Sequence, residues 1–256
     1  MKPRPESLLA VEDLARSYGG IHAVDGVSFE VPRGSLTGMI GPNGAGKSTV
    51  LGMIAGAIRP DRGSIMLDGQ QISGLPSYKT ARRGVIRTFQ AASVFPRMTV
   101  IENLLLGVPP WRGEQLAAAL LRRRSWRREE RQQVERAYDL LARLGLLPLA
   151  DAFAGELSGG QKRLVEIGRA MIARPKLLLL DEPMAGVSRT LAPVIEALVA
   201  ELREEGMTVV LIEHELALVE RLCSPVIVLA QGRVLMQGEM EEARANPEVR
   251  KAYLVG

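Results

Sequence analysis

Three short stretches of this sequence place small, basic and acidic residues at spacings that suit phosphate chemistry. The first is GPNGAGKS, residues 41–48, which fits the pattern G-x-x-x-x-G-K-[ST] between an apolar run and a helical pattern. Glycines in such a loop let backbone N–H groups surround phosphate oxygens, Lys47 would neutralise their charge, and the Ser48 hydroxyl would ligate Mg²⁺. Because strand and helix patterns flank it, a plain glycine-rich turn is a poor alternative. The stretch predicts a nucleotide phosphate site.

The second stretch is the acidic pair Asp181-Glu182, which ends the apolar run LLLLDE at residues 177–182. An acidic pair after a strand is, on its own, more often a helix cap. Open α/β sheets, however, bind ligands at the carboxyl ends of their strands. There Asp181 could hold the hydration shell of Mg²⁺, and Glu182, pointing the other way, could polarise an attacking water. Beside a phosphate loop the second interpretation is favoured.

The third stretch is LSGGQ, residues 157–161, which leads directly into a helical pattern. A Ser-Gly-Gly turn leaves backbone N–H groups free, and a helix N-terminus favours an anion. The chain therefore contains a second candidate phosphate site, although one nucleotide needs a single phosphate loop.

The apolar pattern predicts the elements that position these stretches. Residues 8–16 and 27–31 alternate apolar and polar positions around the turn region YGGIHAVDG, which indicates antiparallel strands. Apolar strands separated by helices follow, and they indicate a parallel sheet covered on both faces. The expected strands are 36–41, 64–69, 176–181, 207–213 and 225–230, and the expected helices are 50–58, 99–145 with a break at 109–113, 158–173, 190–205 and 214–222. Thr99 and Glu102 fit a capping box at the start of the second helical region.

Composition and charge are those of an ordinary globular protein. The 256 residues are 46% hydrophobic and 24% charged, with a net charge of +4. Between residues 112 and 136 there are eight Arg and four Glu, so this segment alone carries +4 and the rest of the chain is balanced. A basic face for nucleic acid is therefore not expected. The arginine-rich helix 114–136 could approach anionic lipid headgroups, but a solvated helix with internal Arg-Glu pairs is favoured.

The sequence contains no pattern typical of a membrane span or a secretory signal. No window approaches the roughly 18 consecutive apolar residues that a spanning helix needs, and the N-terminal residues lack an apolar core and a cleavage site. The single cysteine, Cys223, fits a reducing cytoplasm. It lies in an apolar stretch and is expected to be buried rather than nucleophilic.

In their order and spacing, GPNGAGKS, LSGGQ and LLLLDE resemble the ATP-binding cassette (ABC) ATPases over essentially the whole chain. The resemblance implies an α/β P-loop NTPase fold with a mixed core sheet, an antiparallel β-subdomain and a helical subdomain. It implies one ATP-binding domain over 1–256, with the core and β-subdomain in 1–90 and 162–256 and the helical subdomain in about 91–161. ATP and Mg²⁺ are the implied cofactors.

The same resemblance implies a role for individual residues. Glu182, His214 and Gln90 would be catalytic, and Ser48, Gln90 and Asp181 would hold the metal. The residues that would hold this chain's own nucleotide are Tyr18, Asn43, Gly44, Ala45, Gly46, Lys47, Ser48 and Thr49. The nucleotide bound to a second cassette would be capped by Ser158, Gly159, Gly160 and Gln161. Without the resemblance, Tyr18 could be a strand-edge tyrosine and His214 a structural histidine. Ser188 stands where the family usually has an aspartate that crosses the dimer interface, and its hydroxyl supplies no fixed charge.

Flanking stretches narrow the family. The segment GVIRTFQAASVFPRMTVIENLLLG (84–107), the helical insertion after it, the Ala-Gly loop after Glu182 and the ending NPEVRKAYLVG (246–256) are similar to the ATP-binding subunits of branched-chain amino acid importers. Cassettes for urea or amide uptake and for lipopolysaccharide export share much of this pattern.

The implied function is ATP hydrolysis that drives transport. The implied partners are a second cassette, identical or related, transmembrane permease subunits and an external solute-binding protein, with no nucleic acid. The implied location is the cytoplasmic face of the cell membrane. An ATPase of a lipopolysaccharide-type exporter and a non-transport ABC ATPase acting on nucleic acid are the alternatives, while Glu182 and His214 argue against a purely regulatory nucleotide-binding module.

Overall fold

The computed structural model describes residues 7–88, 93–109 and 123–255. The chain divides into two compact units, of which the first comprises 1–90, 175–185 and 196–256 and the second 91–174 and 186–195. Gly46 of the phosphate loop belongs to the first unit and Ser158 of LSGGQ to the second. The assignment of subdomains within a single ATP-binding domain stays a prediction.

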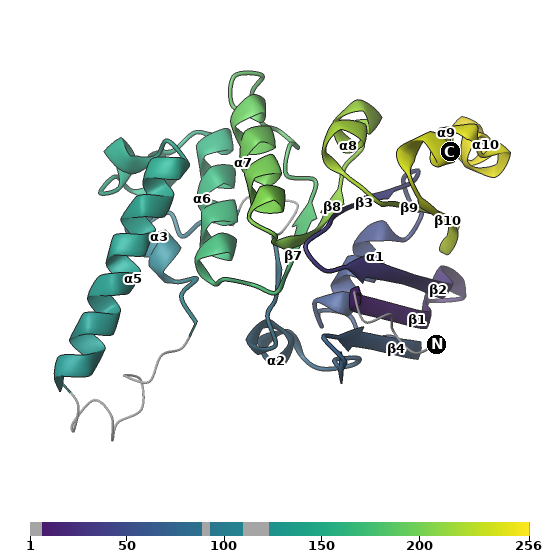
Figure 1. Ribbon diagram of the computed structural model, residues 1–256, viewed down its shortest axis with the longest axis horizontal. Helices are drawn as coiled ribbons and strands as arrows, with labels where there is room; N and C mark the ends of the chain where they lie inside the picture. Colours follow the sequence, from purple (N-terminus) through teal and green to yellow (C-terminus); the bar gives the residue numbers. More distant parts are fainter. Residues whose placement is uncertain (1–6, 89–92, 110–122, 256) are drawn as a thin grey trace. The chain divides into compact units, whose positions relative to one another are not determined.

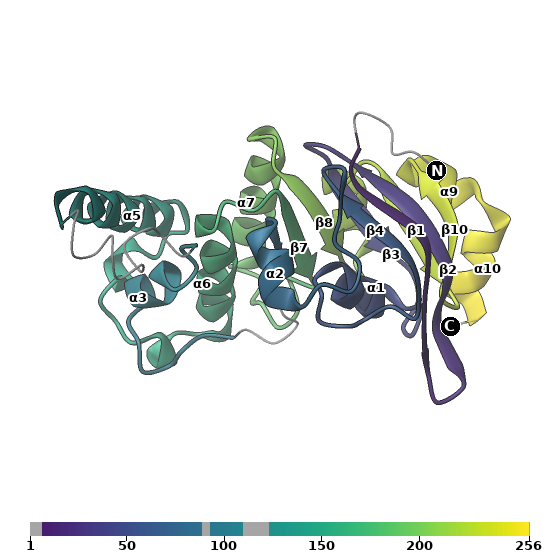
Figure 2. The same ribbon diagram turned by 90° about the horizontal axis from the view of Figure 1, so that it is seen from below.

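Two sheets form the first unit (Figures 1 and 2). An antiparallel sheet has the strand order β2-β1-β4-β5, and a six-stranded sheet has the order β10-β9-β3-β8-β7-β6. The pairs β3–β8, β3–β9, β7–β8 and β6–β7 are parallel, whereas β9–β10 is antiparallel. The prediction of a mixed core sheet and an antiparallel sheet is therefore confirmed. The strands are β1 (Ser7–Tyr18), β2 (Ile21–Pro32), β3 (Leu36–Ile40), β4 (Arg62–Leu67), β5 (Gln70–Gln71), β6 (Val85–Arg87), β7 (Leu177–Asp181), β8 (Thr208–Ile212), β9 (Val226–Ala230) and β10 (Arg233–Gly238).

Helix α1 (Lys47–Ile54) supplies the centre of the core of this unit. Its buried residues Val50, Leu51, Met53 and Ile54 belong to one apolar cluster with side chains of both sheets. The remaining helices of the unit are α2 (Ser77–Arg82), most of α7 (Ala192–Glu204), α8 (Leu216–Leu222), α9 (Met240–Ala245) and α10 (Pro247–Val255). Burial of the first helix after β3 fixes the start of α1, and hence the phosphate loop, against the sheet.

Helices and short loops form the second unit. It contains α3 (Val100–Leu105), α5 (Arg123–Arg143), the 3-10 turns η2 (Leu147–Leu149) and η3 (Ala154–Glu156), and α6 (Gly159–Ile172). Thr99 caps α3 in the capping box predicted with Glu102. Gly168 lets α6 approach its neighbours, because a Cβ there would lie 2.6 Å from Leu144 Cδ1. Residues 110–122 of the arginine-rich segment lie outside the described residues.

Several expected boundaries were wrong. The turn after β1 is only Gly19-Gly20, because both glycines take a positive φ (51° and 86°) and a two-residue hairpin lets β2 start at Ile21. Helix α1 begins three residues before the expected start at 50 and ends at Ile54, since Gly56 at φ 72° leaves the helical conformation. Helix α8 begins at Leu216 rather than 214. Within the described residues, no helix has the length and apolar run needed to cross a bilayer.

Candidate functional site

The phosphate loop lies between β3 and α1, where the sequence predicted it. Its backbone requires glycine at both ends. A Cβ on Gly41 (φ 152°) would lie 2.1 Å from the Leu229 carbonyl oxygen, and one on Gly46 (φ 98°) 2.4 Å from that of Ala23. The first N–H groups of α1 have no partner within the helix and carry the positive end of its dipole. The loop therefore presents donors to an anion at the start of α1.

Lys47 is folded back onto the loop that it would serve. Its ammonium donates to the carbonyl oxygens of Gly41 (2.7 Å) and Pro42 (3.0 Å), and the residue is only 6% exposed. Burial lowers the pKa of Lys47, and the charges of Glu182 and Asp181 oppose that shift. A phosphate could replace these carbonyls as the partner of a cation that is already positioned and largely desolvated.

Asp181 is buried at the end of β7, and only one of its carboxylate oxygens has a partner. Oδ2 accepts from Arg87 Nη2 at 2.7 Å, whereas Oδ1 is buried with no hydrogen-bond partner among the described residues. An unsatisfied buried carboxylate oxygen is costly, so a further donor is expected there. A water bound to Mg²⁺ would be such a donor, and the donor set therefore fits the predicted metal. Among the residues that the structure describes, no group of three or more His, Cys, Asp or Glu side chains is placed to hold a metal ion.

Glu182 and His214 contact each other. His214 Nε2 lies 2.7 Å from Glu182 Oε1, with side-chain exposures of 47% and 16%. The parallel pairing of Asp181 with Ile212 brings the ends of β7 and β8 together, so both residues follow neighbouring strands. Glu182 adopts φ 49°, a conformation that is uncommon for a residue with a side chain. Two residues predicted separately thus form one acid–imidazole pair.

Glu213 contacts the backbone on both sides of this pair, at Met184 and at His214, and the sequence did not single it out. It is 6% exposed, and its carboxylate accepts the backbone N–H groups of Met184 (3.0 Å) and His214 (3.3 Å). Burial raises its pKa, while the two N–H donors oppose the shift. Its contacts connect the loop after β7 to the residue after β8.

Tyr18 ends β1 and is 45% exposed, as a residue that stacks on a base must be. The Arg16 guanidinium lies over its ring, 4.9 Å from the centroid, and is itself paired with Asp61 at 2.6 Å. One ring face is therefore covered by a fixed cation.

The LSGGQ stretch forms the N-terminus of α6 in the second unit. Ser158 is the N-cap: its hydroxyl accepts the Gln161 N–H, and Gln161 Oε1 accepts the Ser158 N–H. The Ser158 O–H remains able to donate, as do the first N–H groups of the helix. Gly160 is buried, and a Cβ there would lie 2.5 Å from Leu191 Cδ1. The capping box thus rigidifies a turn that presents donors outward.

Two further predicted residues give less information. Ser188 is exposed, and its hydroxyl lies 2.9 Å from that of Thr190. Gln90 lies outside the described residues, so its predicted contacts with metal and nucleotide stay a prediction.

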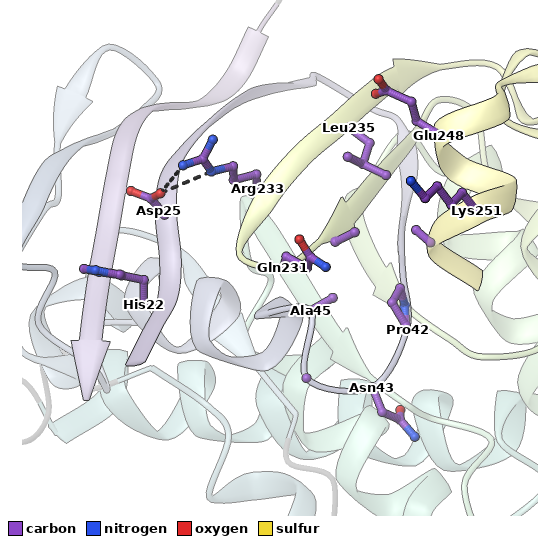
Figure 3. Close-up of a pocket in the computed structure, with 13 residues that line it drawn as sticks. His22, Asp25, Pro42, Asn43, Ala45, Gln231, Arg233, Leu235, Glu248 and Lys251 are labelled. Carbon is purple, nitrogen blue, oxygen red and sulfur yellow. Dashed lines mark hydrogen bonds and ion pairs between the residues drawn. The ribbon is translucent and has the colours of Figure 1, made fainter. Parts of the chain in front are cut away.

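A cavity of about 670 Å³ lies along the phosphate loop (Figure 3). Asn43, Gly44 and Ala45 line it, together with residues of β2, β10 and α10. Figure 3 shows Arg233 paired with Asp25 on one side and Lys251 of α10 on the other; the Arg233–Asp25 distance is 2.6 Å. Tyr253, also in α10, has its pKa raised by burial to about 12, and a hydrogen bond with the Gly41 backbone opposes the shift. The Tyr253 hydroxyl of the C-terminal helix therefore lies near the backbone of the first glycine of the loop.

Comparison with known proteins decides the family. The profile of the family described as "ABC transporter" matches residues 24–185. The chain belongs to this family. It is 43% identical to the high-affinity branched-chain amino acid transport ATP-binding protein BraF of Pseudomonas aeruginosa, over 96% of this chain and 97% of that protein. It is 40% identical to the LivG protein of the same description from Escherichia coli, over 97% and 98% of the two chains.

Solved structures agree with the fold. A crystal structure of a nucleotide-free ATP-binding cassette from an ABC transporter superposes with a TM-score of 0.81 at 37% identity, over 96% of this chain and 98% of that one. The ADP conformation of such a cassette gives a TM-score of 0.81 at 36% identity, over 97% and 98% of the two chains. The P-loop NTPase fold is confirmed, and so is the classification of the chain as an ATPase of the ABC family.

Proposed function

We propose that this ABC ATPase powers an importer of branched-chain amino acids or of a related amide or urea solute. The contact between Glu182 and His214 beside the phosphate loop carries the hydrolytic part of the proposal. The relatives BraF and LivG, described as branched-chain amino acid transport proteins, support the solute class.

The described residues suggest how ATP is held. The base stacks on the free face of Tyr18, and the phosphates bind the loop from Asn43 to Thr49, where Lys47 exchanges its carbonyl partners for phosphate oxygens. Mg²⁺ would be held by the Ser48 hydroxyl, by Oδ1 of Asp181 through its hydration shell, and by Gln90. When bound, Mg²⁺ neutralises charge on the phosphate oxygens.

Hydrolysis then depends on the acid–imidazole pair. Glu182 orients the attacking water and accepts its proton as the water oxygen bonds to the γ-phosphorus and ADP leaves. His214 holds Glu182 and would contact the γ-phosphate. The low exposure of Glu182 limits competing hydration of its carboxylate.

The LSGGQ turn supplies part of a second nucleotide site, which is shared between two cassettes. Ser158, Gly159, Gly160 and Gln161 cap the γ-phosphate held by a second cassette, and the partner's turn caps the nucleotide held here. Two half-sites in one chain thus require a head-to-tail pair of cassettes with two composite sites, formed by identical or related subunits.

The variant Glu182→Gln tests the hydrolytic assignment. The amide retains the size of the side chain but cannot accept a proton, so we expect ATP binding, a trapped dimer on size-exclusion chromatography, and hydrolysis reduced by about 10²–10⁴-fold. Glu241→Gln, an exposed glutamate of α9, is the matched control. Hydrolysis at the wild-type rate by Glu182→Gln would show that another group acts on the water.

Transport requires permease subunits, and we propose these as the membrane partners of this protein. They would place it on the cytoplasmic face of the membrane. An external solute-binding protein would deliver the solute. Phe95 and Phe153, each 51% exposed on neighbouring segments joined by the Thr99–Phe153 bridge, are the proposed docking residues for a permease segment. The test is ATPase stimulation by candidate permeases of amino acids or of lipopolysaccharide, and by DNA or RNA. Stimulation by a lipopolysaccharide permease or by nucleic acid, rather than by an amino acid permease, would overturn the proposal.

A further inference from the structure

Glu213 belongs to no recognised motif, yet it contacts the segments that carry the residues proposed for hydrolysis. It is the first residue after β8 and has a buried side chain. A glutamate this buried is normally paired or hydrogen-bonded. Its two carboxylate oxygens accept from two different segments, Oε1 from the Met184 N–H and Oε2 from the His214 N–H.

These two segments hold the reacting pair. Met184 follows Glu182 by two residues, and His214 is the other member of the pair. A backbone hydrogen bond from the Glu182 N–H to the Ile212 carbonyl (3.0 Å) joins the same segments at one end. The Glu213 carboxylate joins them a second time, at Met184 and His214. Together the two connections fix the position and the orientation of the loop that carries Glu182.

The backbone of Glu182 makes this connection necessary. At φ 49° the residue occupies a conformation that costs a side-chain-bearing residue energy. Such a conformation persists only where neighbouring contacts hold it. The loop after Glu182 would relax toward an ordinary turn without the bond from Met184, and the carboxylate of Glu182 would then move away from His214.

We propose that Glu213 is a positioning residue for ATP hydrolysis. Its carboxylate holds the Met184 and His214 backbones at a fixed separation, which sets the Glu182–His214 contact at 2.7 Å. In this proposal Glu213 acts through the backbone and not by contact with the nucleotide or the water. The proposal rests on the proposed roles of Glu182 and His214, and it adds a residue that acts through both.

The variant Glu213→Gln tests it with little change in volume. One amide oxygen can replace one carboxylate oxygen as acceptor, but the amide NH₂ then faces the other backbone N–H, so one of the two connections is lost. Displacement of reacting groups by about 1 Å costs on the order of 10²-fold in rate. We expect kcat to fall at least tenfold, while the KM for ATP and the Kd of a fluorescent ATP analogue stay within twofold. Glu215→Gln, an exposed neighbour, is the control and retains wild-type kcat.

A second measurement separates positioning from a general loss of structure. In the Glu182→Gln background, ATP traps the dimer without hydrolysis, so adding Glu213→Gln should leave dimer trapping and nucleotide stoichiometry unchanged. A kcat within twofold of wild type, or a parallel fall of kcat, ATP binding and trapping, overturns the positioning role. If Glu182→Gln and His214→Ala themselves hydrolyse ATP at the wild-type rate, the proposed function fails instead, and that result is distinct from either outcome for Glu213.

Discussion

Replacement of Asp181 separates its structural contact with Arg87 from its proposed contact with the Mg²⁺ shell. The side chains of Asp181 and Arg87 are 3% and 16% exposed and lie 2.7 Å apart. Asp181→Ala leaves the guanidinium buried without its partner, which costs about 3 kcal/mol at the lower end of values for broken buried pairs. Asp181→Asn keeps an oxygen for Arg87 and replaces the ion pair by a hydrogen bond from the charged guanidinium to a neutral acceptor, which costs about 1–2 kcal/mol. The melting temperature of the nucleotide-free Asn variant should therefore fall by roughly 2–8 °C.

The proposed contact with the Mg²⁺ shell predicts which variants lose the effect of Mg²⁺ on ATP binding, and these are not the variants that lose most stability. ATP binding, measured by fluorescence titration with Mg²⁺ and again with EDTA, gives the strengthening that Mg²⁺ provides. Asp181→Asn should lose about 10–100-fold of that strengthening, the usual effect of removing a partner of a metal's ligand shell, and should bind metal-free ATP as wild type does. The matched control is Arg87→Met, which loses stability but keeps both carboxylate oxygens and therefore the response to Mg²⁺. If Asp181→Asn responds to Mg²⁺ as fully as wild type, the assignment of the unpaired Oδ1 to the metal shell is wrong.

Three further predictions concern the base, the thiol and the helical unit. Tyr18→Ala should weaken ATP binding by about 1–3 kcal/mol while Tyr18→Phe retains it, because stacking needs the ring and not the hydroxyl; equal Kd values for the two variants would exclude stacking. Burial raises the pKa of Cys223 to about 12, so the thiol of the folded protein should resist a thiol reagent at pH 8 and react fully in denaturant; fast labelling without denaturant would contradict this. Asn103 is fully buried; its side chain accepts the Phe95 N–H and donates to the carbonyls of Phe95, Met98 and Thr99. Asn103→Ala should lower the free energy of unfolding, measured with urea, by about 2–4 kcal/mol. A loss under 1 kcal/mol would show that the 95–99 loop is held by other contacts.

The phosphate loop and the strand ends were predictable because their residue types answer local requirements. Gly41 and Gly46 are needed by backbone geometry that a sequence motif records. Both β7 and β8 are five-residue buried runs; β7 ends at Asp181 and β8 is followed by Glu213. The antiparallel edge strand β10 was not predicted, since its sequence RVLMQG is short, partly exposed and lacks strict alternation. The short helices α9 and α10 likewise lack the length that makes an apolar period visible.

The contacts within the site were less predictable than its members. Glu182 and His214 are 32 residues apart, and only the adjacency of β7 and β8 brings them together. Arg87 and Glu213 are charged residues of common types at positions that no spacing rule selects. Their importance comes from burial, which depends on the tertiary fold and cannot be read from neighbouring letters. A buried charge next to a recognised motif is therefore found only when the strands are placed.

The unusual backbone of Glu182 explains why such supporting residues surround it. A left-handed conformation at a side-chain-bearing residue costs about 1–2 kcal/mol, and here it is offset by the Ile212 carbonyl, which accepts the Glu182 N–H, and by the bonds through Glu213. The conformation re-aims the side chain after the end of β7, so that Glu182 contacts His214 while the preceding Asp181 contacts Arg87. Two adjacent carboxylates can thus serve different partners without sharing one charged site. The strained residue lies in the loop that follows Asp181. Loss of the bond to the Ile212 carbonyl, or of either bond to Glu213, should therefore disturb the Glu182–His214 contact before it disturbs the buried core.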